Sequence, residues 1–270
     1  DAKMHGYYVA SSIEIMATIS KLLDNGYRYF KNYDDSIIKK NIPELVGLIN
    51  IGLAQNMDSL VPYYKGDEII KLLVLCSKLI NINIGKILVN NEMTTTETIK
   101  TTDIIKYKFN DLAKIKNKLN NLMHIDNKDL TKFINDKYGC SCKIAVILGW
   151  LVGYKRVSNQ TIEKTFESTM PILEKIGESF GFMIKLSNDF VYLENDILNA
   201  DKYSKNYLVN NGFQNGFECF LENKQKFIEG CIQLDVYTNT IKEMIDIIEN
   251  NIDDVINKHS PDLRSTYTLT

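Results

Sequence analysis

Apolar side chains recur every three or four residues along almost the whole chain, and this spacing constrains the fold more than any other feature. In residues 101–124 the repeating apolar positions are Ile105, Phe109, Leu112, Ile115, Leu119 and Leu122. Lysines and asparagines occupy the opposite face, as in an amphipathic helix. There are only four prolines, and no run alternates Val, Ile and Thr. The pattern therefore predicts an all-α protein.

Gly, Pro, Asn and Asp mark the breaks between the expected helices. Besides residues 101–124, the expected helices are 11–23, 43–60, 67–80, 130–137, 144–154, 162–176, 177–196, 213–230 and 238–257. With 270 residues, of which 44% are hydrophobic, the chain can bury a sizeable core. Short connections favour one helical domain over residues 1–258. Residues 259–270 have no apolar period, and we expect a loosely ordered tail there.

Charge and cysteine content limit the partners and the compartment. A formal charge of -2 and a pI near 6.0 do not suit a nucleic-acid surface. Five cysteines without Cys-x-x-Cys spacing suggest free thiols in a reducing compartment, so we expect an intracellular, cytoplasmic protein.

The most apolar run, residues 144–152, is too short to span a bilayer. The lysines of residues 101–124 are expected on a solvated face, and docking on an anionic membrane is the alternative.

One acidic stretch, FMIKLSNDFVYLEND (182–196), lies within an otherwise apolar expected helix. Residues four apart share a helix face, so Asn188, Tyr192 and Asp196 would point together, with Asp189 nearby. Carboxylate and amide oxygens at this spacing can bind Mg²⁺. A diphosphate site would also need a second acidic helix and cationic side chains. The stretch is a candidate metal site or the remnant of one.

The segment IGESFGFMIKLSNDFVYLENDI resembles the second aspartate-rich helix of the trans-prenyltransferases, the all-α isoprenyl diphosphate synthases of the polyprenyl synthetase type. Gly177 and Gly181 match the two glycines of that helix. The residues from Asn188 to Tyr192 stand where the family has Asp-Asp-x-x-Asp, so that only Asp189 survives of the three aspartates.

Four further segments resemble family motifs in the same order along the chain. ASSIEIMATISKLLDN resembles the first motif helix, with Asp24 matching its first aspartate and Asn25 and Arg28 replacing the other two. KKNIPEL, CKIAVILGW and YSKNYLV resemble the basic motifs that follow and align Lys39, Lys40, Lys143 and Lys205. Each motif is degenerate, and the resemblance rests on the shared order of all five over most of the chain.

The resemblance implies an isoprenoid-synthase-type helical bundle that binds a prenyl diphosphate, as a homodimer or as a heterodimer with an active homologue. The implied metal ligands are Asp24, Asp189, Asp196 and Asn188. The implied diphosphate-binding residues are Arg28, Lys39, Lys40, Lys143 and Lys205. The implied prenyl-chain pocket is formed by Met16, Thr18, Ile19 and Ser20.

Departures from the motifs bear on activity, because the family uses three Mg²⁺ ions to activate the diphosphate. Arg28 would place a cation where a ligand should be, and Tyr192 is a poor Mg²⁺ ligand. We therefore expect a diverged member with weak or no chain elongation that binds an isoprenoid or serves as an assembly subunit. An active Mg²⁺-dependent polyprenyl (farnesyl- or geranylgeranyl-type) diphosphate synthase is the first alternative. A terpene cyclase is the second, because Asn188, Tyr192 and Asp196 partly match the metal-binding triad of that class.

Overall fold

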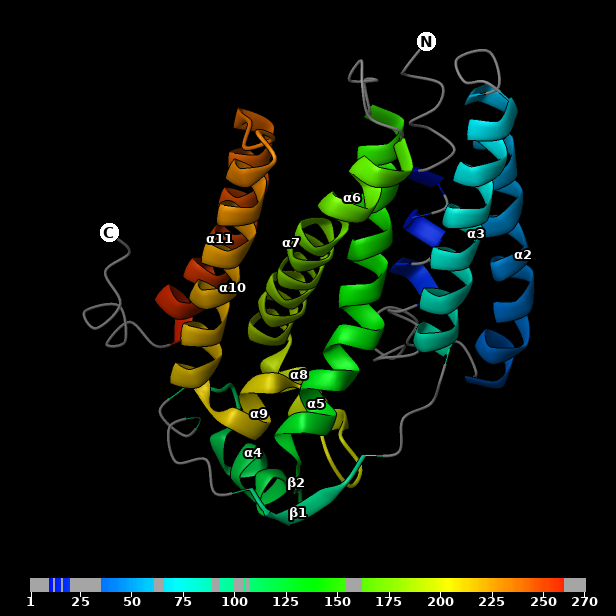
Figure 1. The fold of residues 1–270 in the computed structure, drawn as a ribbon. Helices are drawn as coiled ribbons and strands as arrows, with labels where there is room; N and C mark the ends of the chain where they lie inside the picture. The colour runs from blue at the N-terminus through cyan, green and yellow to red at the C-terminus, as the bar shows by residue number, and fades with distance from the viewer. Residues whose placement is uncertain are drawn as a thin grey trace. The chain divides into compact units, whose positions relative to one another are not determined.

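The structure, a computed structural model, describes residues 10–11, 13–15, 17–19, 35–60, 66–88, 93–99, 104, 107–153 and 162–259. This part of the chain is mostly helical, which confirms the helical prediction, and it also contains one two-stranded sheet (Figure 1). The described residues of the expected helix 11–23 are helical. Across the ranges given above, no helix has the length and apolar character needed to cross a membrane.

The chain forms two compact units. Unit 1 comprises Asp1–Asn90 and Asn135–Gly181, and unit 2 comprises Asn91–Ile134 and Phe182–Thr270. Helix α7 (Ile162–Val191) therefore contributes its first part to unit 1 and its last part to unit 2. One helical domain over residues 1–258 stays a prediction, because two such units can belong to one domain.

Unit 1 is built from helices. In addition to the first part of α7 it contains α2 (Asp35–Leu60), α3 (Gly66–Leu88), the π-helical turn η3 (Asn135–Gly139) and α6 (Cys140–Gly153). Helix α3 packs against α2, which lies beside it in Figure 1, and against α6 and η3. It continues beyond the predicted end at residue 80, because Ile84 and Ile87 extend its buried face and the Asn83 side chain bonds back to the Leu79 carbonyl.

Glycines let α7 approach its neighbours in unit 1. A Cβ at Gly177 would lie 2.4 Å from Cα of Lys143, and one at Gly181 would lie 2.6 Å from the backbone nitrogen of Gly139. The predicted break between residues 176 and 177 was wrong. Gly177 permits the close contact between α7 and the Lys143 backbone, and it does not end the helix.

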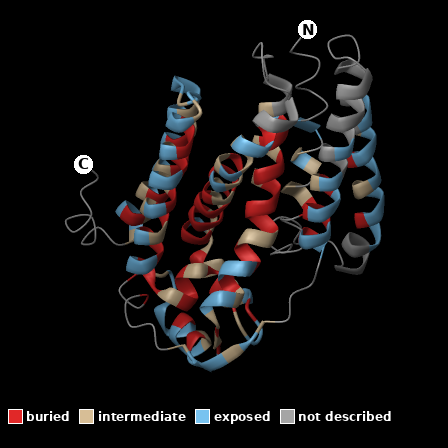
Figure 2. Ribbon diagram, in the orientation of Figure 1, coloured by how far each residue is buried: buried red, intermediate tan, exposed pale blue. Residues whose placement is uncertain are grey.

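In the described part of unit 2, the last part of α7 is joined by six further α-helices and the sheet. The helices are α4 (Leu112–Leu119), α5 (Asn127–Ile134), α8 (Leu193–Asn199), α9 (Tyr207–Asn211), α10 (Phe213–Gln233) and α11 (Asn239–His259). Strands β1 (Thr95–Thr98) and β2 (Met123–Ile125) pair antiparallel, with Thr95 opposite Ile125. The buried faces of α10 and α11 are seen in Figure 2.

Three predictions in unit 2 need correction. Among the described residues of the expected helix 101–124, the α-helical stretch is α4; residues 107–110 are not helical, and Asp111 caps α4 by accepting a hydrogen bond from the Lys114 nitrogen at 3.0 Å. The expected helix 177–196 is interrupted at Tyr192, which separates α7 from α8. The expected tail began at residue 259, but His259 belongs to α11 and its ring stacks on that of Tyr107.

Candidate functional site

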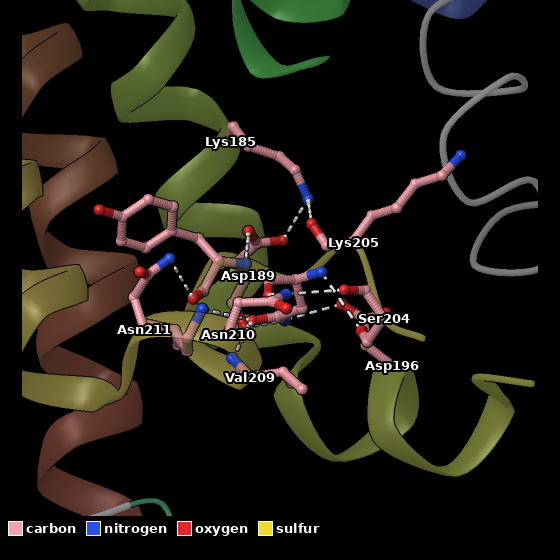
Figure 3. A network of polar contacts seen from close by, with 11 residues as sticks. Lys185, Asp189, Asp196, Ser204, Lys205, Val209, Asn210 and Asn211 are labelled. Atoms are coloured by element: carbon pink, nitrogen blue, oxygen red, sulfur yellow. Dashed lines mark hydrogen bonds and ion pairs between the residues drawn. The ribbon is translucent and has the colours of Figure 1, made fainter. Parts of the chain in front are cut away.

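The acidic stretch of α7 lies in a buried polar core, which we define as Lys185, Asp189, Asp196, Ser204, Asn206 and Asn210. All six are buried residues of unit 2. Figure 3 shows this network between the end of α7, α8 and the segment that leads into α9. Buried polar groups are tolerated when their hydrogen bonds are satisfied.

An ion pair forms the centre of the polar core. Lys185 and Asp189 are one helical turn apart on α7 and therefore share a face. The Lys185 ammonium lies 2.6 Å from Oδ1 of Asp189, and neither side chain is exposed to solvent. A charged group of this kind is costly to bury alone, so each partner requires the other.

The second carboxylate oxygen of Asp189 and the Lys185 ammonium also form hydrogen bonds with the segment after α8. The Tyr207 backbone N–H donates to Oδ2 of Asp189 at 2.8 Å, and the Lys185 ammonium donates to the Lys205 carbonyl at 3.0 Å. Both oxygens of the Asp189 carboxylate therefore accept a hydrogen bond. The ion pair attaches the segment before α9 to the end of α7.

Asn206 is the hub of the hydrogen bonds around this pair. Its side-chain nitrogen donates at 2.8 Å both to the Asp189 backbone carbonyl and to Oδ2 of Asp196. Its side-chain oxygen accepts from the backbone nitrogens of Leu208 and Val209, at 2.9 and 3.4 Å, and so caps α9. An asparagine supplies the two donors and the acceptor that this position requires.

Asn210 extends the network to the sheet. Its side-chain nitrogen donates to the carbonyls of Ser204 and Asn206, at 2.7 and 2.9 Å, while its side-chain oxygen accepts from the Ile125 nitrogen of β2 at 2.8 Å. The backbone N–H of Asn206 in turn donates to the Ser204 hydroxyl at 3.2 Å. The network therefore fixes α7, α8, α9 and β2 of unit 2 to one another.

The structure brings two of the four expected metal ligands, Asp189 and Asp196, into the polar core. Asn188 is half-buried on α7 and lies outside the core as defined, and Asp24 lies outside the described residues. The helix is interrupted at Tyr192, which stands at the N-cap position of α8 without a side-chain cap hydrogen bond. The Tyr192 nitrogen still bonds to the Asn188 carbonyl and the Asp196 nitrogen to the Tyr192 carbonyl, so the expected common face of Asn188, Tyr192 and Asp196 stays a prediction.

The expected diphosphate-binding cations have different environments. In unit 1, Lys143 is buried and forms an ion pair with Glu178, while Lys40 is exposed on α2. In unit 2, the Lys205 ammonium lies 4.8 Å from the centre of the Phe133 ring, a cation–π arrangement. The side chain of Lys39 and the whole of Arg28 lie outside the described part of the chain.

Only part of the expected chain pocket is described. Ile19 is buried and Thr18 is half-buried in a helical stretch, whereas Met16 and Ser20 lie outside the described residues. The pocket stays a prediction, as do the roles of Asp24 and Arg28.

Sequence reasoning missed Lys185, Asn206 and Asn210 as members of the site. A signal for Lys185 was present, because a lysine four residues before an aspartate within an apolar helix predicts an ion pair. Asn206 precedes the short apolar run Tyr-Leu-Val, which is consistent with a helix cap. Its contacts with Asp189 and Asp196 have no local signal, because they join separate elements.

The polar core is a hydrogen-bonded network in which the Lys185 ammonium neutralises the Asp189 carboxylate. Within the residues that the structure describes, no group of three or more His, Cys, Asp or Glu side chains is placed to hold a metal ion. Comparison with protein-family models, curated proteins and solved structures found no match. The family resemblance therefore rests on the motifs alone.

Proposed function

We propose that this chain is a diverged trans-prenyltransferase-like protein that binds a prenyl diphosphate without elongating it and without requiring Mg²⁺. The motif order supports the family, and the ion pair between Lys185 and Asp189 supports the loss of elongation. In this proposal, the remaining aspartate of the second motif has become part of the folded core.

The loss of elongation is inferred from the ion pair, because both carboxylate oxygens of Asp189 already interact with a donor from the chain itself. Oδ1 faces the Lys185 ammonium at 2.6 Å and Oδ2 accepts from the Tyr207 nitrogen at 2.8 Å. A Mg²⁺ ion bound directly to Asp189 would compete with these donors and would be repelled by the adjacent Lys185 ammonium. Metal-assisted departure of diphosphate supplies most of the catalysis in such a reaction, so this loss favours binding over turnover.

Lys205 is the described cation best placed to receive a diphosphate in unit 2. Its backbone carbonyl is held by Lys185, and its half-buried side chain rests on the Phe133 ring. A cation–π contact at such a site is worth about 1 kcal/mol, less than a charge-assisted hydrogen bond to phosphate. In this proposal, an anion competes with the ring for the Lys205 ammonium.

Calorimetric titration with farnesyl thiodiphosphate, a non-reactive analogue, tests the proposal in the presence of Mg²⁺ and in excess EDTA. We expect the same affinity under both conditions and a loss of about tenfold or more in Lys205→Ala, since a charged hydrogen bond contributes about 1.5–3 kcal/mol. Lys202→Ala is the matched control, because Lys202 is an exposed lysine of the same segment. Its affinity should change less than about twofold.

Product analysis distinguishes the alternatives. Incubation with isopentenyl diphosphate and an allylic diphosphate should give no elongated product. Mg²⁺-dependent elongation by the wild type would establish an active polyprenyl diphosphate synthase, and release of a hydrocarbon or terpene alcohol from farnesyl diphosphate would establish a cyclase. Absence of analogue binding under both conditions would overturn the proposal and favour an assembly subunit, for which a homodimer or a heterodimer with an active homologue stays the prediction.

A further inference from the structure

The Lys185 ammonium has the surroundings of a bound cation. It lies 2.6 Å from the carboxylate of Asp189 and 3.0 Å from the backbone carbonyl of Lys205, and its side chain has no solvent exposure. Carboxylate and backbone carbonyl oxygens are also the usual protein ligands of hard divalent cations. The ammonium therefore occupies a position whose oxygen atoms suit a positive ion of either kind.

The oxygen atoms around this position are held by contacts that do not pass through the ammonium. Asp189 is fixed through its second carboxylate oxygen by the Tyr207 nitrogen. Asn206 links the Asp189 backbone to Asp196 and caps α9, which orders the residues next to Lys205. Truncation of Lys185 at Cβ would leave a space next to a buried carboxylate, which is unfavourable unless a cation or water enters.

We infer that the Lys185 ammonium is the resident cation of the polar core and takes the place of a metal ion at Asp189. The wild-type chain then binds no divalent cation at Asp189, and a chain without this ammonium accepts a small cation in the same position. The inference concerns the ligand-free protein and does not depend on prenyl diphosphate binding.

Three variants of the full chain test the inference. Lys185→Ala removes the charge and leaves space, Lys185→Met removes the charge and fills the space, and Lys185→Ala combined with Asp189→Asn also removes the carboxylate. Their thermal unfolding is measured with Mn²⁺, with ethylammonium or with neither, at constant ionic strength. Ethylammonium supplies the missing charge and part of the missing volume, and Mn²⁺ binding is measured separately by electron paramagnetic resonance.

We expect only Lys185→Ala to respond to the added cations, with its Tm rising by several degrees, at least about 3 °C. Wild type, Lys185→Met and the double variant should shift by less than about 1 °C. Mn²⁺ should bind to Lys185→Ala and be absent from Asp189 in the wild type. If Lys185→Ala does not fold unaided, recovery of folded protein in ethylammonium is the measurement.

Lys224→Ala is the matched control. Lys224 forms an ion pair with Glu249 at 2.5 Å in the same unit, but both side chains are partly exposed, so that water can hydrate the remaining carboxylate. No cation response is expected from it. The inference is overturned if Lys185→Ala shows no gain with either cation, if Lys224→Ala gains as much, or if wild type binds Mn²⁺ in a manner that Asp189→Asn abolishes.

Discussion

The side-chain nitrogen of Asn206 lies 2.8 Å from the Asp196 carboxylate and connects α8 to the start of α9. The same nitrogen bonds to the Asp189 carbonyl at the end of α7. One amide group therefore joins three helices of unit 2. Because Asp196 and Asn206 are both buried, their bond replaces one that water would otherwise provide.

Asn206→Ala should lower the free energy of unfolding by about 2–4 kcal/mol, since it removes the α9 cap and the two buried hydrogen bonds that Asn206 donates to Asp189 and Asp196. Urea unfolding provides the measurement. Asn215→Ala is the control, because Asn215 is exposed on α10 and bonds only locally, to the Asn211 carbonyl. It should change stability by no more than about 0.5 kcal/mol. Equal effects of the two substitutions would argue against a connecting role for Asn206.

The ion pair predicts strong coupling between Lys185 and Asp189. Lys185→Met and Asp189→Asn should each cost about 3–5 kcal/mol, because each leaves a buried charge without its partner. The double variant should lose less than the sum of the two, because neither charge remains. Equilibrium unfolding of wild type, the two single variants and the double variant in urea measures this coupling as a double-mutant cycle. Additive losses would mean that the two groups do not neutralise each other in the folded state.

Gly181→Ala should destabilise unit 1 by about 2 kcal/mol or more, since the added Cβ would lie 2.6 Å from the Gly139 nitrogen and 2.7 Å from the Tyr138 carbonyl carbon, both backbone atoms. Gly149→Ala is the matched helical control, because nothing lies within 4 Å of its added Cβ. That variant should gain about 0.5–1 kcal/mol from helix propensity. Thermal unfolding distinguishes the two, and a stable Gly181→Ala would contradict the close approach of α7 to η3.

Stability should fall in alkaline solution, in part through Cys231. Burial raises the pKa of this thiol from 9.0 to about 11. The folded state therefore retains a proton that the unfolded state releases, so the contribution is fully present below pH 9 and is lost as the pH rises towards 11. The loss attributable to Cys231 is about 2 kcal/mol. Urea unfolding of wild type and Cys231→Ala between pH 8 and pH 11 should show a steeper decline in wild type, and parallel curves would contradict this origin.

Local patterns in the sequence determined most of the helices. The apolar spacing that predicted helix 238–257 reappears in α11 as a buried stripe of Ile245, Ile248, Ile252 and Ile256. Such a pattern is readable because helix periodicity depends only on residues three or four apart. Asp189 was likewise singled out by its place in an apolar expected helix, and Gly177 and Gly181 by the family resemblance.

Tertiary contacts decided what those residues do. Gly177 and Gly181 could have ended a helix, but the close approach of η3 and α6 keeps them inside α7. Asp189 could have been a metal ligand by its spacing, yet its partners include Tyr207 and Asn206, which follow it by 18 and 17 residues. Residues so far apart meet only when α8 and α9 have packed, and helix periodicity carries no information about such contacts. The sequence therefore determined which side chains could matter, and packing determined that Asp189 is neutralised from within the chain.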